Sequence, residues 1–113
     1  MKVISVRFYA TQSGHEPVLD WLKALTREDR RAVGQDIKTV EIGWPIGMPV
    51  VRKLDKGLWE VRSDLTGGRI ARVLFTVANG EMVLLHAFTK KSQKTPASDL
   101  DLAKSRRNDV LRK

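Results

Sequence analysis

The sequence predicts a small α+β domain in which helices pack against an antiparallel β-sheet. Residues 3–9 alternate between polar and apolar side chains, residues 17–43 carry apolar side chains at helical spacing, and residues 58–89 form three apolar runs separated by turn sequences. Alternation is typical of a half-buried strand, and helical spacing is typical of an amphipathic helix. The 113 residues suffice for one ordinary domain, so residues 1–113 are predicted to form a single domain.

Two helices are predicted between the first strand and the rest of the sheet. Pro17 stands where a helix accepts proline at its first position, and an apolar stripe follows it. Thr26 and Asp29 have the spacing of a helix-capping pair, and the apolar spacing continues to about Gly43. Two prolines and a glycine in residues 44–49 then end regular structure.

The remaining strands and a last helix follow. Asn79-Gly80 between two apolar runs is the strongest local signal for a two-residue hairpin. Thr95 and Pro96 predict a C-terminal helix with Thr95 as its N-cap and Pro96 at its first position. The predicted strands are 3–9, 50–54, 58–63, 69–77 and 82–89.

Charge and composition narrow the class of partner. The formal net charge is +8 and the isoelectric point is near 10.2, a surplus that attracts polyanions such as nucleic acid, a membrane surface or an acidic protein. The chain has no cysteine and only two histidines, His15 and His86, which are far apart, so no metal site and no cofactor are expected. The N-terminus lacks a continuous apolar run, and no stretch approaches about 18 consecutive apolar residues, so we expect a soluble, cytoplasmic protein.

The hairpin also predicts which side chains share a face of the sheet. With Ala78 opposite Glu81, the pairing steps outward along both strands. The pairs predicted to face the main core are Phe75 with Leu84, Val73 with His86 and Ala71 with Phe88. The side chains predicted to share the opposite face with Arg72 are Glu60, Arg62, Leu74, Leu85, Ala87, Ile70, Thr89 and Lys91.

Arg72 is the most informative residue of this second face. A charge in the middle of a central strand costs several kcal/mol if it is buried without a partner. One interpretation pairs Arg72 with Glu60 in a structural salt bridge, and another uses Arg72 to bind a phosphate. The two are compatible, because Glu60 can occupy the guanidinium until an anion arrives.

The sequence favours structural roles for both histidines. His86 has a side chain whose ordinary pKa lies near neutrality, which invites a role as general base. The predicted register places it opposite Val73 and in the core, so a core histidine is the favoured interpretation. His15 is expected to be a surface residue or a cap.

A run of lysines follows the last predicted strand. Lys90, Lys91 and Lys94 lie between the end of that strand and the start of a helix, where backbone N–H groups and the helix dipole favour anions. Such a position predicts a site for a polyphosphate chain rather than a merely solvated cluster. Further positive charge is predicted from Lys53, Lys56, Lys104, Arg106, Arg107, Arg112 and Lys113.

Several segments together resemble a known family. These are "SGHEPVLDWLKAL" at 13–25, "GMPVVRKL" at 47–54, "GLWEVR" at 57–62, "RIARVLF" at 69–75 and "LLHAFTKKSQKTP" at 84–96. They are similar to the HigB-type, phage-related branch of the RelE/ParE toxins. The resemblance implies the toxin of a bacterial type II toxin–antitoxin system, a ribosome-dependent endoribonuclease that cuts mRNA and is held inactive by a helix-turn-helix, HigA-like antitoxin. It implies a RelE/ParE-like fold, with two N-terminal helices on an antiparallel sheet and a C-terminal helix beside the active cleft.

The resemblance also assigns roles to residues. The strand arginine of the family corresponds to Arg72 and its post-strand basic residues to Lys90 and Lys91, with a weaker correspondence for Arg62. The chain departs from some relatives because no Tyr or His follows position 86. Glu60 or a lysine is the candidate acid or base. The RNA-binding residues predicted with them are Lys53, Lys56, Lys94, Arg69, Arg106 and Arg107.

The hypothesis that follows is metal-independent cleavage of RNA. An mRNA 2′-OH attacks the adjacent phosphate while Arg72, Lys91 and Arg62 stabilise the charge on the phosphoryl oxygens. Two alternatives stay open. One is a ParE-like inhibitor that binds DNA gyrase, and the other is a non-catalytic basic protein that binds nucleic acid.

Overall fold

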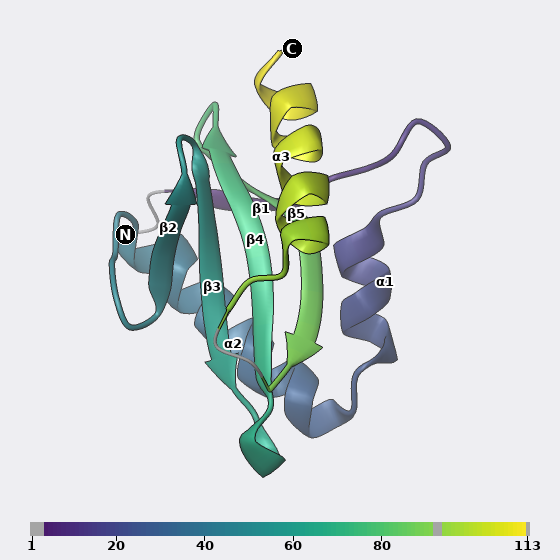
Figure 1. The fold of residues 1–113 in the computed structure, drawn as a ribbon. Coiled ribbons are helices and arrows are strands. Elements are labelled where there is room, and N and C mark those ends of the chain that lie inside the picture. Colours follow the sequence, from purple (N-terminus) through teal and green to yellow (C-terminus); the bar gives the residue numbers. More distant parts are fainter. Residues whose placement is uncertain (1–3, 92–93, 113) are drawn as a thin grey trace.

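The computed structural model describes residues 4–91 and 94–112 and contains a five-stranded sheet and three α-helices there (Figure 1). The predicted order of strands and helices is confirmed, although the start of the first predicted strand, at residue 3, lies outside the described residues. The elements are β1 (Ser5–Phe8), α1 (Pro17–Ala24), α2 (Arg27–Gly43), β2 (Val51–Asp55), β3 (Leu58–Asp64), a short 3-10 turn (Thr66–Gly68), β4 (Ile70–Ala78), β5 (Glu81–Lys90) and α3 (Ala97–Leu111).

The sheet has the strand order β1-β5-β4-β3-β2. Strands β2 to β5 form an antiparallel meander, but β1 pairs with β5 in parallel. The prediction of a purely antiparallel sheet is therefore wrong at this edge. Alternation within residues 5–8 shows that they form a strand, but the direction of β1 is set by the route of the chain through α1 and α2 to the far edge at β2.

The two faces of the sheet carry separate apolar clusters. α1 and α2 lie over one face, where Val40 packs in one cluster with Val61 and Phe75. α3 lies over the other face, in front of the sheet in Figure 1, where Ala103 packs in a cluster with Leu85. The N-terminal helices therefore cover one side of the sheet, and the C-terminal helix covers the side that carries Arg72.

The β4–β5 hairpin confirms the predicted turn but not the predicted register. Asn79 and Gly80 both have positive φ, 53° and 74°, and Ala78 stands opposite Glu81 as expected. Beyond the pair of Phe75 and Leu84, however, the register shifts by one residue.

This shift is a β-bulge at Leu85, and it exchanges the faces of the residues that follow it. His86 stands opposite Leu74 instead of Val73, and Phe88 stands opposite Arg72 instead of Ala71. Ala87 and Thr89 were predicted beside Arg72, but they are opposite Val73 and Ala71 on the other face.

The helix starts are confirmed for α1 and α2 and corrected for α3. α1 begins at Pro17, and the Thr26 hydroxyl caps α2 by accepting a hydrogen bond from the Asp29 amide at 3.2 Å. α3 begins at Ala97 with Pro96 as its N-cap, one residue later than predicted, and its cap makes no side-chain hydrogen bond. Thr95 is therefore not the cap.

Candidate functional site

Three arginines gather on the α3 side of the sheet. Arg62 of β3 stands directly opposite Arg72 of β4. Arg52 of β2 stands opposite Glu60 of β3. Alternation along β3 puts Glu60 and Arg62 on one face, as predicted. We call Arg52, Arg62 and Arg72 the arginine cluster. Like charges that face each other in a sheet destabilise it, so the cluster needs an anion, and Glu60 is placed to supply one.

Arg72 and Glu60 form a fully buried pair, with relative exposures of 0% each. Arg72 Nη1 lies 3.7 Å from Glu60 Oε2. The Thr95 hydroxyl bridges them, because it donates to Glu60 Oε2 at 2.7 Å and accepts from Arg72 Nη1 at 3.2 Å. This bridge explains why Thr95 does not cap α3. Its hydroxyl is hydrogen-bonded to Glu60 and Arg72 instead of to a backbone N–H at the start of the helix.

The cluster holds more positive than negative charge. Burial lowers the pKa of Arg72, Glu60 opposes that shift, and nearby Arg62 and Arg52 add to it. Glu60 Oε1 makes no hydrogen bond among the described residues and lies 3.8 Å from Arg62 Nε. One carboxylate thus stands among three guanidinium groups, an arrangement that a further anion such as a phosphate would complete.

His86 lies on this same face and not in the α1–α2 core, so its predicted core role is wrong. The bulge at Leu85 turns its imidazole toward α3, where Nε2 lies 2.7 Å from Asp99 Oδ1. The side chains of His86 and Asp99 are 16% and 18% exposed. No feature of the run of leucines before His86 signals the bulge, which is why the sequence did not predict this pair.

Of the lysines at and beyond the end of β5, the sheet register places one, Lys90. Lys90 is exposed and stands opposite Ile70, two residues beyond the Phe88–Arg72 pair, so alternation places it on the face of Arg72. Lys91 and Lys94 are exposed as well, and neither lies within a strand or helix. The alternation that was predicted to bring Lys91 beside Arg72 instead favours Lys90.

Two of the predicted RNA-binding residues hold α3 against the sheet. Arg106 donates to the carbonyl of Leu85 at 2.8 Å. Arg107 donates to Asp55 Oδ2 at 2.6 Å and to the carbonyl of Lys56 at 2.8 Å. Their guanidinium groups therefore serve contacts within the protein.

The other predicted basic residues lie apart from the arginine cluster. Arg69 forms a two-pronged ion pair with Asp29 of α2, at 2.8 and 3.2 Å. Lys53 is exposed but stands opposite Trp59, which belongs to the α1–α2 side. Lys56 is exposed in the turn between β2 and β3. The structure instead adds Arg52, which stands opposite Glu60. Pairing the predicted strands 50–54 and 58–63 would have indicated this position from the sequence.

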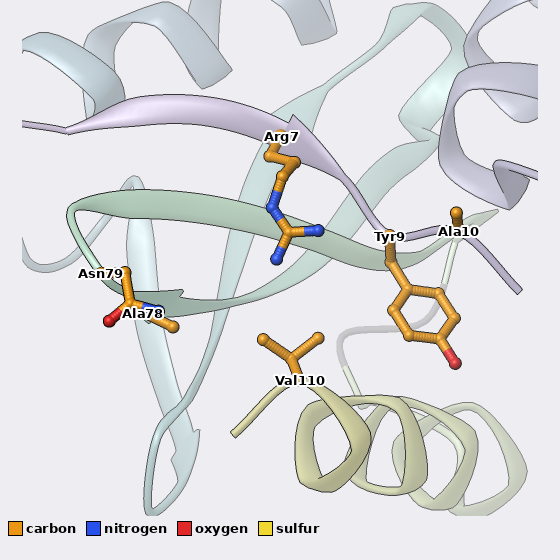
Figure 2. A pocket seen from close by; sticks show the side chains of 6 residues that line it. All are labelled: Arg7, Tyr9, Ala10, Ala78, Asn79 and Val110. Atoms are coloured by element: carbon orange, nitrogen blue, oxygen red, sulfur yellow. The ribbon is translucent and has the colours of Figure 1, made fainter. Parts of the chain in front are cut away.

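A separate hollow of about 280 Å³ lies at the other end of α3 (Figure 2). Tyr9 donates its hydroxyl proton to Asp109 Oδ2 at 3.0 Å, and the guanidinium of Arg106 stands 5.6 Å from the centre of its ring. The residues that line the hollow are Arg7, Tyr9, Ala10, Ala78, Asn79 and Val110. Since Thr95 precedes α3 and Val110 lies near its end, this hollow is distinct from the arginine cluster.

The described part of the chain contains neither a group of metal-binding side chains nor a helix that could span a membrane. Within it, no three His, Cys, Asp or Glu side chains are grouped so as to hold a metal ion. None of its helices has both the length and the apolar character needed to span a bilayer.

Together the fold and the site define a class of mixed α+β proteins with a cationic cluster beneath a C-terminal helix. Residues 20–108 match the family described as Phage derived protein Gp49-like (DUF891). The match covers most of the chain, so the protein belongs to this phage-derived family, which comprises toxin-type proteins similar to RelE and HigB. Such a family implies an antitoxin partner in general. No protein of curated function matches the chain.

Proposed function

We propose that this protein, as one toxin-like domain over residues 1–113, is the toxin of a type II toxin–antitoxin system and a ribosome-dependent mRNA endoribonuclease of the HigB type. The observation that carries the proposal is the arginine cluster around Glu60. Arg62 faces Arg72 across two strands, and Arg52 stands beside them with a single carboxylate among the three. Family membership supports the assignment to the toxins. The arginine cluster supports a reaction at a phosphate, because guanidinium groups bind phosphoryl oxygens.

Glu60 occupies the place that an RNA phosphate takes during cleavage. Arg72 is fully buried, whereas the Arg62 side chain is 19% exposed and Arg52 is exposed. A phosphate therefore meets Arg52 and Arg62 first. Arg72 joins when the phosphate displaces the hydrogen bonds of the Thr95 hydroxyl to Glu60 and Arg72. Breaking these bonds is offset by charge-assisted contacts to the phosphoryl oxygens, which are stronger than bonds to a neutral hydroxyl.

The chemistry needs orientation and charge stabilisation from the protein. RNA carries its own nucleophile, the 2′-OH, next to the phosphate that it attacks. Guanidinium groups that are already held in position stabilise the negative charge that grows on the phosphoryl oxygens. Lys90 and Lys91, at the end of β5, extend this positive field toward the RNA chain.

The partners follow from the same proposal. The net charge of +8 suits the ribosome and its mRNA, whose backbones are polyanionic. The antitoxin is a HigA-like protein with a helix-turn-helix domain, and the system acts in the cytoplasm.

The test compares substitutions inside and outside the cluster. Arg72→Ala and Arg62→Ala should abolish growth inhibition and mRNA cleavage on ribosomes, measured by primer extension after induction. Arg62→Ala serves if the buried Arg72→Ala does not fold. Arg7→Ala, which removes the same charge from the exposed edge strand β1, should remain toxic.

Two outcomes contradict the proposal. Folded Arg72→Ala and Arg62→Ala proteins that still cut mRNA would remove the arginine cluster from the mechanism. Growth arrest with intact mRNA and damaged DNA would favour the gyrase-binding alternative.

A further inference from the structure

A histidine and a carboxylate stand beside the arginine cluster. His86 is opposite Leu74 on β4, and the next residue of its face, Phe88, is opposite Arg72. His86 and Arg72 are therefore diagonal neighbours on one sheet face, at a spacing of about 7–8 Å between backbone positions. The His86 side chain is 16% exposed, so solvent reaches it while Arg72 is enclosed.

The contact with Asp99 determines which nitrogen of the His86 imidazole can accept a proton. Nε2 is held 2.7 Å from Asp99 Oδ1, in the first turn of α3. Among the described residues, no hydrogen bond is made to Nδ1. When a neutral imidazole donates from one nitrogen to a carboxylate, its other nitrogen carries a lone pair that accepts a proton. The carboxylate then stabilises the imidazolium that forms, as in catalytic His–Asp pairs generally.

Glu60 is a poor group for the same task. Its carboxylate is fully buried and lies within 3.7 and 3.8 Å of Arg72 and Arg62. Its Oε2 also accepts a hydrogen bond from the Thr95 hydroxyl, so this enclosed carboxylate is not open to the 2′-OH of an RNA while the pair is intact. A proton acceptor is needed elsewhere on this face, and among its described residues His86 has the side chain suited to proton transfer near neutral pH.

We propose that His86 is the general base of the RNA cleavage and that Asp99 is its positioning residue; this inference rests on the proposed function. His86 Nδ1 takes the proton of the 2′-OH as that oxygen forms a bond to phosphorus. The bond from phosphorus to the 5′-oxygen breaks, and the leaving oxygen takes a proton from water. The products are a 2′,3′-cyclic phosphate and a 5′-hydroxyl end. The imidazolium then returns its proton to solvent.

A purely structural role makes a different set of predictions. The His86–Asp99 pair ties the first turn of α3 to β5, so its loss could loosen the helix and slow cleavage indirectly. A loosened helix would not be repaired by a small base in solution. Chemical rescue therefore separates the two roles.

The experiment measures single-turnover cleavage of a short mRNA on purified ribosomes. His86→Ala should reduce the rate by about a hundredfold to ten-thousandfold, the usual contribution of general acid–base catalysis. Added imidazole should restore part of that rate, because it can occupy the space of the lost ring. The matched control is His15→Ala, at the exposed second histidine, which should cut at the wild-type rate with or without imidazole.

Asp99→Asn tests the positioning role. It keeps the shape of the side chain but loses the charge that stabilises the imidazolium, so it should slow cleavage while leaving ribosome binding unchanged. His86→Gln replaces His86→Ala in the rate comparison if the alanine variant does not fold. A folded His86 variant that cuts at the wild-type rate would overturn the inference, as would a slow, folded His86→Ala protein that imidazole does not rescue.

Failure of the proposed function has its own signature. If the wild-type protein cuts no mRNA on ribosomes, the endoribonuclease proposal fails and the base assignment fails with it. If the wild type cuts and the His86 variants cut equally well, only the base assignment fails.

Discussion

At the scale of single residues, the buried Glu60–Arg72 pair decides the state of the candidate site. The charges of both side chains are enclosed, and the Thr95 hydroxyl links them at 2.7 and 3.2 Å. Glu60 therefore compensates the charge of Arg72 within the folded chain. This pairing explains why a charged residue is tolerated in the middle of a central strand.

Removing one partner of this pair should be more damaging than removing both. Glu60→Ala should lower the free energy of unfolding by about 3–5 kcal/mol, because it leaves a buried charge without its partner. The double variant Glu60→Leu/Arg72→Met should recover most of that loss. Denaturant unfolding measures both, with the exposed Glu28→Ala as a control that changes stability by about 0.5 kcal/mol or less. Equal losses in the single and double variants would contradict this account.

At the scale of elements, periodicity and turn chemistry predicted the strands and helices and their order. The Asn79-Gly80 turn and the Thr26 cap were predicted because each depends on a local backbone requirement. The bulge at Leu85 was not predicted, since Leu84 and Leu85 are both apolar and fit either face. The placement of Arg72, Arg62 and Glu60 on one face was predicted, whereas that of His86 was not. Arg72, Arg62 and Glu60 lie on strands without a shift between them, whereas His86 lies beyond it.

The packing of α3 at its C-terminal end can be tested through the only tyrosine in the sequence. Burial raises the pKa of Tyr9, and its hydrogen bond to Asp109 raises it further. Asp109→Asn should therefore bring the pKa of Tyr9 closer to its usual value. The ultraviolet absorbance of the phenolate, followed in a titration with base, reports this residue alone. An unchanged titration curve would mean that α3 does not hold Tyr9 in solution.

At the scale of the whole molecule, ion pairs join helices on both faces to the sheet and its turns. Asp29 of α2 binds Arg69 beside β4, and Asp55 of β2 binds Arg107 of α3. Each pair crosses from one layer to the next, so α2 and α3 are both fixed by charge as well as by apolar contact. Arg69 and Arg107 were predicted to bind RNA, but both form ion pairs within the protein. The sequence does not show this, because the partner of a charged side chain depends on the assembled fold.

Because of these ion pairs, the stability of the fold should depend on pH in the acidic range. The hydrogen bond from Arg69 lowers the pKa of Asp29, and that from Arg107 lowers the pKa of Asp55, each from an ordinary value of 3.8. Depressed folded pKa values mean that the stabilisation is complete above the ordinary value and is lost as pH falls through the depressed one. Thermal unfolding between neutral and acidic pH should show a smaller acid-induced loss for Asp29→Asn than for the wild type. Asp101→Asn, an exposed control, should keep the wild-type profile.

The bulge in β5 decides which face of the sheet carries His86. In a ladder of the same length without the register shift, Ala87 would stand opposite Arg72 and His86 opposite Val73, on the side of the N-terminal helices. Deleting Leu85 would also make the ladder regular, but it would keep His86 opposite Leu74 and Phe88 opposite Arg72. The extra residue in β5 therefore places the histidine on the side of α3, while the hairpin turn keeps its own register.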